Sequence, residues 1–379
     1  MGDLLRQEIV QTAEVIVVKV GTNVLTHEDG LLNVNRIVEL AEDLWRLMLD
    51  GRKVILVSSG AIGAGMGRLK LAKRPGEIPE LQAVAAIGQG KLMEAYGLAL
   101  EQLGGLAAQV LLTADDLSNR TRYLNTRNAL RSILRFYALP IINENDTVSI
   151  EELHTTFGDN DRLAALVANL FESPLLVLLT DVDGLYDGDP ALKSSQMIPL
   201  VSRWSPSLMQ MVAEKRSKRS KGGMSSKLKA AQMVTTSGGN VIIANGDRPG
   251  ILTDIFSGQE TGTLFLAQGT RLSARKRWIG FAGQVRGRIT IDDGAVQALE
   301  KKGKSLLPIG ILDCQGAFNK GDLVSIVNQE GEEVARGLSN YSLKEITLIR
   351  GKKTREIREI LGHCPYQEII HCDNLQLTN

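Results

Sequence analysis

Two lysines stand where an ammonium group needs an anionic partner, and Lys19 is the first. It interrupts the apolar run 15–20, a pattern typical of a strand buried on both faces, just before Gly21. Full burial of an ammonium group without a partner is unfavourable, so we expect Lys19 to reach from the strand end into a site that contains anions. The run alone leaves an alternative open, in which the lysine extends from an edge strand to solvent.

Lys227 is the second. It ends the segment 221–227, in which two glycines and then hydroxyl residues precede a helix predicted at 226–234. Backbone N–H groups of such a segment can bind an anion at a helix start. The prediction puts Lys227 in the first helical turn, where the helix dipole disfavours a cation, and this favours a negative ligand nearby. The five basic residues of 215–221 are instead typical of a solvated surface.

Acidic and amide side chains follow two predicted strand ends. Residues 143–146 end one strand, and residues 158–161 open the next helix. A single carboxylate at a helix start is often only a cap. Together the two segments carry four carboxylates and three amides, which favours a binding site. Two further strand ends, 58–65 and 180–184, contain glycines that either admit an anion or a nucleotide or serve only as turns.

Strands that alternate with helices must position these residues. The alternation predicts a mainly parallel sheet covered by helices on both faces, a three-layer αβα sandwich of the α/β class. Ligands of such sheets bind at the carboxyl ends of the strands, where the residues above fall. Buried strands are predicted at 15–20, 53–58, 109–112, 140–143, 175–179 and 240–244, and helices at 35–51 with Asn35 as its cap, 80–103, 121–138, 161–171 and 226–234.

The pattern changes between residues 266 and 280. Beyond this point the apolar runs are short and the turns are rich in Gly, Asp and Asn, as in a small, mainly β domain. We therefore divide the chain into an α/β domain at 1–265, a linker at 266–279, and a mainly β domain with a tail at 280–379. The second domain is predicted to hold strands at 288–291, 323–327, 334–337 and 369–372 and one helix at 293–302.

Composition excludes several classes of protein. The chain has 379 residues, 43% of them hydrophobic, and a net charge of +1. No run approaches 18 apolar residues and the first residues do not resemble a signal peptide, so we expect a cytoplasmic protein without a membrane span. Three cysteines argue against a disulfide framework. Residues 275–379 carry 16 Lys and Arg against 13 Asp and Glu, too small an excess for a strong nucleic-acid binder.

Two familiar nucleotide motifs and one metal pattern are also missing. Arg68 stands where a dinucleotide fingerprint needs glycine, and Ala298 stands where a Walker A loop needs glycine before 303–305. The pairs 363–364 and 371–372, each a His followed by a Cys, match no familiar zinc spacing, and we interpret them as structural. No metal-binding residue is therefore predicted.

The ordered motifs resemble those of the amino acid kinase superfamily, in particular its glutamate-phosphorylating members. They run from Lys19–Thr22 through 58–61, Asn143–Asp146, 158–161 and 180–181 to 222–227. The tail, with Arg275–Trp278 at its start and Ser305–Gly310 inside, is similar to the PUA domain that these kinases carry. The resemblance covers nearly the whole chain.

The resemblance implies roles for named residues. Lys19 and Lys227 grip the transferring phosphoryl group, and Asp161 lies between them. Lys221 and the loop 149–157 depart from the family pattern, so no role is carried over to either. Positions that match the glutamate site are Ser59, Asp146 and Asn160, with Asn143 and Asp159 beside them, and positions that match the ATP site are Lys19, Thr180, Asp181, Gly222, Gly223, Met224, Ser225, Ser226 and Lys227.

The reaction implied is phosphorylation of the γ-carboxylate of L-glutamate by ATP and Mg²⁺, which gives L-glutamate 5-phosphate. In this family the product begins proline biosynthesis, which implies feedback inhibition by proline, and the chain is expected to form a homo-oligomer. A carboxylate with a pKa near 4.3 is already ionised at pH 7, so the chemistry needs cations rather than a general base. The nucleotide phosphates would carry most of the Mg²⁺ coordination.

Other functions stay open from the sequence. The nearest alternative is a kinase of the same superfamily that acts on aspartate, N-acetylglutamate or a nucleoside monophosphate. The PUA-like tail and the stretch 143–146 favour glutamate. A different class, an RNA-binding protein, follows from the PUA-like domain alone, and the weak positive charge of the tail argues against it.

Overall fold

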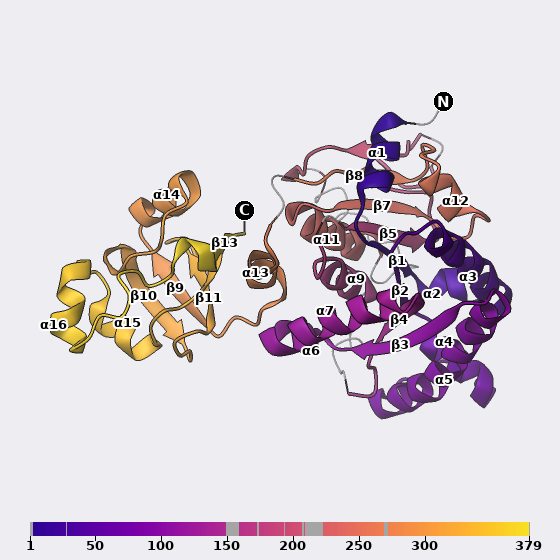
Figure 1. Ribbon diagram of the computed structural model, residues 1–379, viewed down its shortest axis with the longest axis horizontal. Coiled ribbons are helices and arrows are strands. Elements are labelled where there is room, and N and C mark those ends of the chain that lie inside the picture. Colours follow the sequence, from indigo (N-terminus) through magenta and orange to yellow (C-terminus); the bar gives the residue numbers. More distant parts are fainter. Residues whose placement is uncertain are drawn as a thin grey trace. The chain divides into compact units, whose positions relative to one another are not determined.

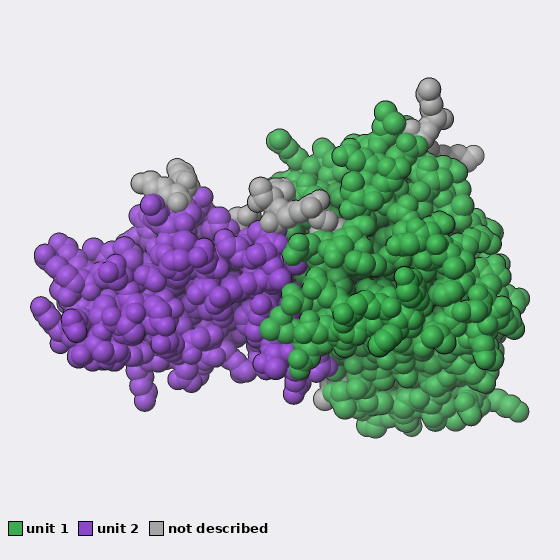
Figure 2. Space-filling model, viewed as in Figure 1, with its two compact units in different colours: residues 1–114, 124–271 green, residues 115–123, 272–379 purple. Residues whose placement is uncertain are grey.

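The computed structural model describes residues 3–27, 29–148, 159–172, 174–192, 194–206, 208, 223–268 and 272–378. They form two compact units, one of residues 1–114 and 124–271 and the other of residues 115–123 and 272–379 (Figure 2). The second unit thus includes a short segment from the middle of the chain. The boundaries predicted from the sequence, with a linker at 266–279, stay a proposal.

An eight-stranded sheet forms the centre of the first unit, in the order β3-β4-β2-β1-β5-β7-β8-β6 (Figure 1). All neighbouring strands are parallel except β7 and β8, so the predicted mainly parallel sheet is confirmed. The strands are β1 (Ile16–Val20), β2 (Val54–Ser58), β3 (Leu106–Leu112), β4 (Ala138–Glu144), β5 (Leu175–Thr180), β6 (Leu200–Val201), β7 (Asn240–Asn245) and β8 (Thr263–Phe265).

Helices cover both faces of this sheet, which gives the predicted three layers. One core joins alternate residues of β1, β2, β5 and β7 to α1 (Leu4–Thr12), α3 (Val34–Leu49), α5 (Ile78–Gln102) and α12 (Ile251–Phe256). After β3 the strand order runs back across the sheet. Right-handed crossovers therefore place the next helices on the opposite face, and Figure 1 shows them side by side. These helices are α7 (Arg120–Arg135), α9 (Asp159–Ala168) and α11 (Gly223–Thr236).

Two short helices follow strand ends at the carboxyl edge. Gly21 leads from β1 into α2 (Thr22–Leu25), and the left-handed Gly60 (φ 102°) leads from β2 into α4 (Ala61–Leu69). Sequence periodicity did not predict α4, because its small residues form no amphipathic pattern. A further short helix, α6 (Ala114–Ser118), follows β3.

Two predicted helix starts are wrong. The side chain of Asn33, not Asn35, caps α3, because it accepts the backbone N–H of Arg36 at 3.1 Å. The helix α11 begins at Gly223 rather than at Ser226. Lys227 therefore lies just beyond the first turn, where the helix dipole acts on it less than the sequence suggested.

Glycine allows α4 and α5 to pack closely. A Cβ atom on Gly88 of α5 would lie 1.8 Å from the carbonyl oxygen of Ala61 and 2.3 Å from the backbone nitrogen of Gly65. A Cβ atom on Gly65 would in turn lie 1.9 Å from the carbonyl oxygen of Val84. The two backbones therefore approach within a distance that no side chain allows, and this fixes α5 next to the strand ends.

The second unit contains a five-stranded sheet in the order β10-β9-β11-β12-β13. Its core is apolar, and the predicted small, mainly β domain is confirmed. The strands are β9 (Gly287–Ile291), β10 (Ile311–Gly316), β11 (Leu323–Val327), β12 (Glu333–Leu338) and β13 (Leu375–Leu377), and the helices are α13 (Ala274–Arg277), a π-helical turn (Trp278–Ala282), α14 (Asp293–Lys302), α15 (Leu343–Ile349) and α16 (Ile357–Leu361).

The strand predicted at 369–372 is wrong. Ile370 forms only an isolated bridge with Leu306, and a 3₁₀ turn at Cys372–Asn374 follows it. The last strand is β13, three residues beyond the predicted end. Cys372 and the other two cysteines, all in the described part of the chain, are free thiols. Among the described residues, no helix has both the length and the apolar character needed to cross a membrane.

Candidate active site

Lys19 lies at the carboxyl end of β1, between β2 and β5. Its backbone pairs with Val57 on one side and Leu178 on the other, so it is in the centre of the sheet. Val18 and Val20 point into the core below α3 and α5, and alternation along the strand directs Lys19 to the opposite face, below α9. The edge-strand alternative is therefore excluded, and the lysine is only 5% exposed.

Asp161, in the first turn of α9, joins the two lysines. Its Oδ1 lies 2.7 Å from Lys19 Nζ, and its Oδ2 lies 3.3 Å from Lys227 Nζ. The hydroxyl of Ser226 donates to the same Oδ2 at 2.7 Å. Lys19, Asp161 and Lys227 thus form one group, which we call the lysine clamp; its first two members are buried and Lys227 is partly buried. Each ammonium group contacts one oxygen of the carboxylate.

The Asp161 carboxylate is held in its ionised form. Burial alone would raise its pKa, but the charges of Lys19 and Lys227 and the hydrogen bonds from Lys19 and Ser226 outweigh burial and lower the pKa below its ordinary value. Both oxygens already have cationic partners. The carboxylate therefore serves to hold the two lysines and is poorly suited to bind a metal ion.

A chain of amide and hydroxyl groups lies beside the lysine clamp. Asn160 donates from Nδ2 to Ser59 Oγ at 2.9 Å and to Asn143 Oδ1 at 3.2 Å. Asn143 donates from Nδ2 to Oε1 of Gln89, on α5, at 2.9 Å. We call these four residues the amide relay. They come from α5, α9 and the ends of β2 and β4, and so connect the two helical layers across the sheet edge.

The structure describes the other two residues of the predicted glutamate site, Asp146 and Asp159, in less detail. Asp146 follows β4, is partly buried, and opposes the effect of burial on Arg74, whose pKa is lowered by burial. Asp159 begins α9, but its side chain and the loop 149–157 lie outside the described residues. Of the five residues predicted for the glutamate site, Ser59, Asn143 and Asn160 are thus the ones that the structure shows hydrogen-bonded together in the described part of the chain.

At the end of β5, Thr180 and Asp181 occupy the side of the clamp nearest α11. Asp181 accepts hydrogen bonds from Thr180 Oγ1 at 3.0 Å and from Asn23 Nδ2, on α2, at 2.9 Å. Burial would raise the pKa of Asp181, but these hydrogen bonds, its own backbone N–H and the charge of Lys227 lower it. The carboxylate is therefore ionised and within electrostatic reach of the clamp.

The start of α11 carries the other residues predicted to bind ATP. Gly223, Met224, Ser225 and Ser226 form its first turn, so their backbone N–H groups are those that a helix leaves without partners inside it. Ser226 turns its hydroxyl toward the clamp. Gly222 and Lys221 lie outside the described residues.

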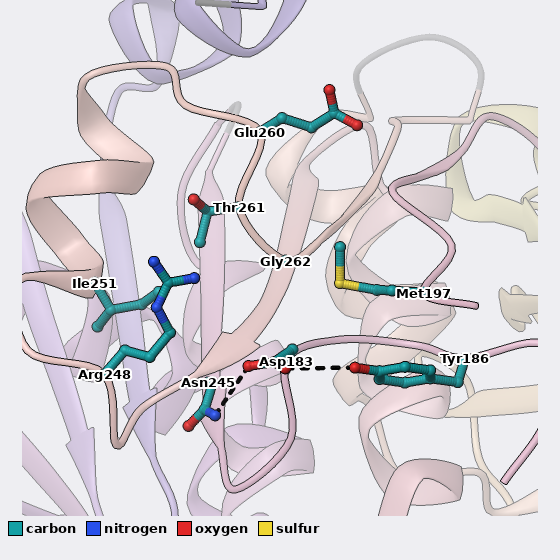
Figure 3. Close-up of a pocket in the computed structure, with 9 residues that line it drawn as sticks. All are labelled: Asp183, Tyr186, Met197, Asn245, Arg248, Ile251, Glu260, Thr261 and Gly262. Carbon is teal, nitrogen blue, oxygen red and sulfur yellow. Dashed lines mark hydrogen bonds between the residues drawn. The ribbon is translucent and has the colours of Figure 1, made fainter. Parts of the chain in front are cut away.

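A cavity of about 240 Å³ opens beside the ends of β5 and β7 (Figure 3). Asp183, one of its lining residues, accepts hydrogen bonds from Asn245 Nδ2 at 3.0 Å and from the Tyr186 hydroxyl at 3.4 Å. Its other walls combine apolar and charged groups. The cavity is lined by Asp183, Tyr186, Met197, Asn245, Arg248, Ile251, Glu260, Thr261 and Gly262.

Sequence reasoning missed three features of this edge. Gln89 lies within a helical apolar pattern and gave no signal of its own. Asn23 directly follows the motif Lys19–Thr22 but had no assigned role. The cavity residue Tyr186 follows the Asp183 turn closely enough that the turn could have drawn attention to it.

The terminal His and Cys residues lie in the second unit. Ligand atoms of His371, Cys372 and Asp373 lie within 4.8 Å of one another. His371 already accepts the backbone N–H of Asp373 at Nδ1, at 3.2 Å, and so caps the 3₁₀ turn. This hydrogen bond gives His371 a structural role.

Comparisons with known proteins identify the family. The profile of the amino acid kinase family matches residues 14–245, and that of the PUA domain matches residues 287–361. A "Glutamate 5-kinase" from Rhodopirellula baltica is 48% identical over 373 residues, covering 98% of this chain and 96% of the relative. Proteins of the same name from Caldanaerobacter subterraneus and Burkholderia multivorans are 47% and 44% identical, covering 95% and 98% of this chain and 96% and 100% of the relatives. This chain belongs to the amino acid kinase family, among its PUA-containing glutamate 5-kinases.

Proposed function

We propose that this protein transfers the γ-phosphoryl group of ATP to the γ-carboxylate of L-glutamate, which yields L-glutamate 5-phosphate and ADP. One observation carries the proposal: the lysine clamp and the amide relay meet at adjacent residues, Asp161 and Asn160, at the carboxyl edge of one sheet. A phosphate held by the first would therefore lie close to an amino acid held by the second.

The chemical step needs no general base in this site. A γ-carboxylate with a pKa of about 4.3 is ionised at pH 7 and is itself the nucleophile. One of its oxygens bonds to the γ-phosphorus while the bond from that phosphorus to the β,γ-bridging oxygen breaks, and the electron pair leaves with ADP. The difficulty is repulsion between two anions, so positioning and positive charge should supply most of the acceleration.

The lysine clamp supplies that charge. Lys19 and Lys227 each carry an ammonium group with three hydrogens, which suits them to donate to phosphate oxygens. Asp161 prevents the two ammonium groups from separating before the nucleotide binds. Mg²⁺, when bound, neutralises charge on the nucleotide phosphates, and the committed oxygens of Asp161 fit a metal held by those phosphates rather than by this carboxylate.

The nucleoside part of ATP would extend away from the clamp toward β7. Thr180 and Asp181 lie along this direction, and the cavity at the ends of β5 and β7 offers the aromatic ring of Tyr186 and polar groups at its rim. This placement leaves the amide relay, on the other side of Lys19, for the amino acid. The order along the edge is then nucleoside, phosphates and glutamate.

Other properties implied by the family stay proposals. The product would enter proline biosynthesis, with proline as a feedback inhibitor, in a cytoplasmic homo-oligomer. RNA binding by the PUA domain has only the family profile in its favour.

The proposal is tested by trapping the product. The protein is incubated with ATP, Mg²⁺ and hydroxylamine, and hydroxamate formation from L-glutamate, L-aspartate and N-acetyl-L-glutamate is compared. We expect L-glutamate to react with a kcat/KM at least about 100-fold above the other two, since each would misplace a carboxylate or block the ammonium group. Preference for another acceptor would replace glutamate as the substrate, and absence of any hydroxamate would refute carboxylate phosphorylation.

A further inference from the structure

We propose that Gln89 is a positioning residue for the amino-acid end of the site. By holding the amide of Asn143, it turns Asn160 so that the Asn160 Oδ1 atom accepts a hydrogen bond from the α-ammonium group of the substrate. The inference rests on the proposed function and adds the means by which the site distinguishes a free amino acid from an acid that lacks the ammonium group.

Helix packing brings Gln89 to this position. It follows Gly88, whose missing side chain lets α5 lie against the backbone of Ala61 and Gly65. Asn143 follows Ile141 by two residues on β4, so its side chain faces the same side of the sheet. Ile141 packs there into the core shared with α5. The Gln89 side chain is buried, at 9% exposure, and meets Asn143 from that side.

The hydrogen bonds fix which way each amide faces. The backbone N–H of Glu144 orients Asn143, so Asn143 Nδ2 faces Gln89 and donates to its Oε1 at 2.9 Å, while Gln89 Nε2 is buried without a partner among the described residues. The Oδ1 end of Asn143 then accepts from the backbone N–H of Glu144 at 2.9 Å and from Asn160 Nδ2 at 3.2 Å. With these two donors, both lone pairs of this oxygen are used.

The Asn160 side chain has one polar atom that makes no hydrogen bond within the amide relay. Its two Nδ2 hydrogens go to Asn143 Oδ1 and to Ser59 Oγ. Its Oδ1 is buried and has no hydrogen-bond partner among the described residues. A buried acceptor without a partner is unfavourable, and a bound donor relieves it. Of the groups on an amino acid, the α-ammonium is the cationic donor, whereas a carboxylate would be repelled by this oxygen.

Removal of the Gln89 amide should loosen this arrangement. Without Gln89 Oε1, only the backbone N–H of Glu144 holds the Asn143 amide, so this amide can tilt away from Asn160. Asn160 would then keep its hydrogen bond to Ser59 alone, and its Oδ1 would be held less firmly toward the ligand. The site's preference for a substrate that carries an ammonium group would weaken.

The test compares L-glutamate with glutarate, which has the same reacting carboxylate but no ammonium group. Hydroxamate formation gives kcat/KM for each, and their ratio measures recognition of the ammonium. We expect a ratio of about 10⁴ for the unaltered protein. In Gln89→Met the ratio should fall about tenfold, mainly through the KM for L-glutamate, while the KM for ATP stays within twofold.

Two variants separate positioning from general loosening. Gln102→Met makes the same change at an exposed site on α5 and should leave the ratio unchanged. Gln89→Glu keeps an acceptor oxygen for Asn143, and its added charge favours the ammonium, so the ratio should stay or rise even if both KM values increase. A ratio that stays constant in Gln89→Met, or that falls in Gln89→Glu as it does in Gln89→Met, would overturn the proposal.

A double-mutant cycle tests the path through Asn143. If Gln89 acts through this residue, Gln89→Met should change the ratio less than twofold in an Asn143→Ala background. A further tenfold fall there would show that Gln89 acts independently and would refute the relay. If the unaltered protein phosphorylates neither substrate, the proposed function itself fails, whereas an unchanged ratio in an active Gln89→Met protein rejects only this inference.

Discussion

At the phosphoryl end of the site every charged group has a partner of opposite charge, and at the amino-acid end two polar atoms have no partner among the described residues. Asp161 contacts both lysines, so each ammonium group has an anionic partner. Hydrogen bonds connect all four residues of the amide relay, yet Asn160 Oδ1 and Gln89 Nε2 are buried without a partner in the described part of the chain. An unpaired acceptor discriminates between ligands, because only a donor relieves it.

The two ends of the site therefore have different roles at the same edge of the sheet. Each lysine ammonium is a compact charge that can bind any phosphate. It can contact the carboxylate of Asp161 and the ligand at the same time. Side-chain amides have a direction, and fixing that direction selects one chemical group. Changes at the clamp should therefore affect turnover, and changes at the relay should affect the choice and affinity of the amino acid.

The largest effect is expected from Asp161→Asn. Removing the shared carboxylate leaves two ammonium groups together at a largely buried site, and loss of one partner of a buried ion pair costs about 3–5 kcal/mol. We expect unfolding in denaturant to show a loss near the lower value. A non-hydrolysable ATP analogue should restore more stability to this variant than to the unaltered protein, because its phosphates replace the missing charge.

A control for that result is Glu94→Gln. Glu94 pairs with Lys91 at 2.9 Å on the exposed surface of α5, where such pairs contribute about 1 kcal/mol at most. Equal losses in Glu94→Gln and Asp161→Asn would contradict the structural role assigned to the clamp.

Lys227→Ala should lower kcat by about 10², the usual scale for removing one preorganised charge contact. The KM for L-glutamate should change little, because the amide relay does not involve Lys227. Lys229→Ala, at an exposed position two residues along α11, provides the control and should have normal kcat. A Lys227→Ala protein with near-normal turnover would remove Lys227 from the phosphoryl end.

Gly88→Ala tests the packing that supports the relay. The new Cβ atom would lie 1.8 Å from a backbone oxygen, so we expect a loss of about 3 kcal/mol in unfolding free energy and a higher KM for L-glutamate. Gly97→Ala, on the same helix with open space around it, should instead stabilise the protein by about 0.5–1 kcal/mol. Similar melting temperatures for the two variants would show that the close approach of α4 and α5 is unimportant.

Asp146→Asn should raise the KM for L-glutamate about tenfold and leave the KM for ATP within twofold, as expected for loss of one charge-assisted contact at the amino-acid end. Steady-state kinetics with each substrate varied in turn measures both constants. An equal rise in the two would take Asp146 out of the amino-acid site.

The smallest effect is expected from pH. The pKa of Asp161 is lowered in the folded protein, so its ion pairs contribute stability that is fully present above the ordinary pKa of about 3.9 and is lost as pH falls through the lowered value. The difference in unfolding free energy between the unaltered protein and Asp161→Asn should therefore be constant from pH 8 to 5. A decline within that interval would contradict the ionised state assigned to Asp161.

Much of the fold and of the phosphoryl end could be predicted from the sequence. A lysine in a buried apolar strand needs an anionic partner, so its type and place predicted that Lys19 reaches into a site. That Asp161 is this partner was implied by the family resemblance. The start of α11 was not predicted. Glycine and serine have low helix propensity, and the tertiary contact of Ser226 with Asp161 overrides this propensity.

Gln89 shows why the amino-acid end was harder to predict. Its role depends on how closely α5 approaches α4, which Gly65 and Gly88 decide together although they are 23 positions apart. A polar residue in a helical pattern is usually exposed, and only the packed structure reveals that this one is buried against Asn143. The unpaired state of Asn160 Oδ1 is likewise a property of the assembled network.

Isotope transfer tests most directly the claim that the substrate carboxylate attacks the γ-phosphorus. L-Glutamate labelled with ¹⁸O in both γ-carboxylate oxygens is incubated with unlabelled ATP, Mg²⁺ and hydroxylamine, and the inorganic phosphate is analysed by mass spectrometry. Hydroxylamine cleaves the acyl phosphate at carbon, so each hydroxamate formed should release one phosphate that carries one ¹⁸O atom. Unlabelled phosphate released together with hydroxamate would contradict attack by the carboxylate.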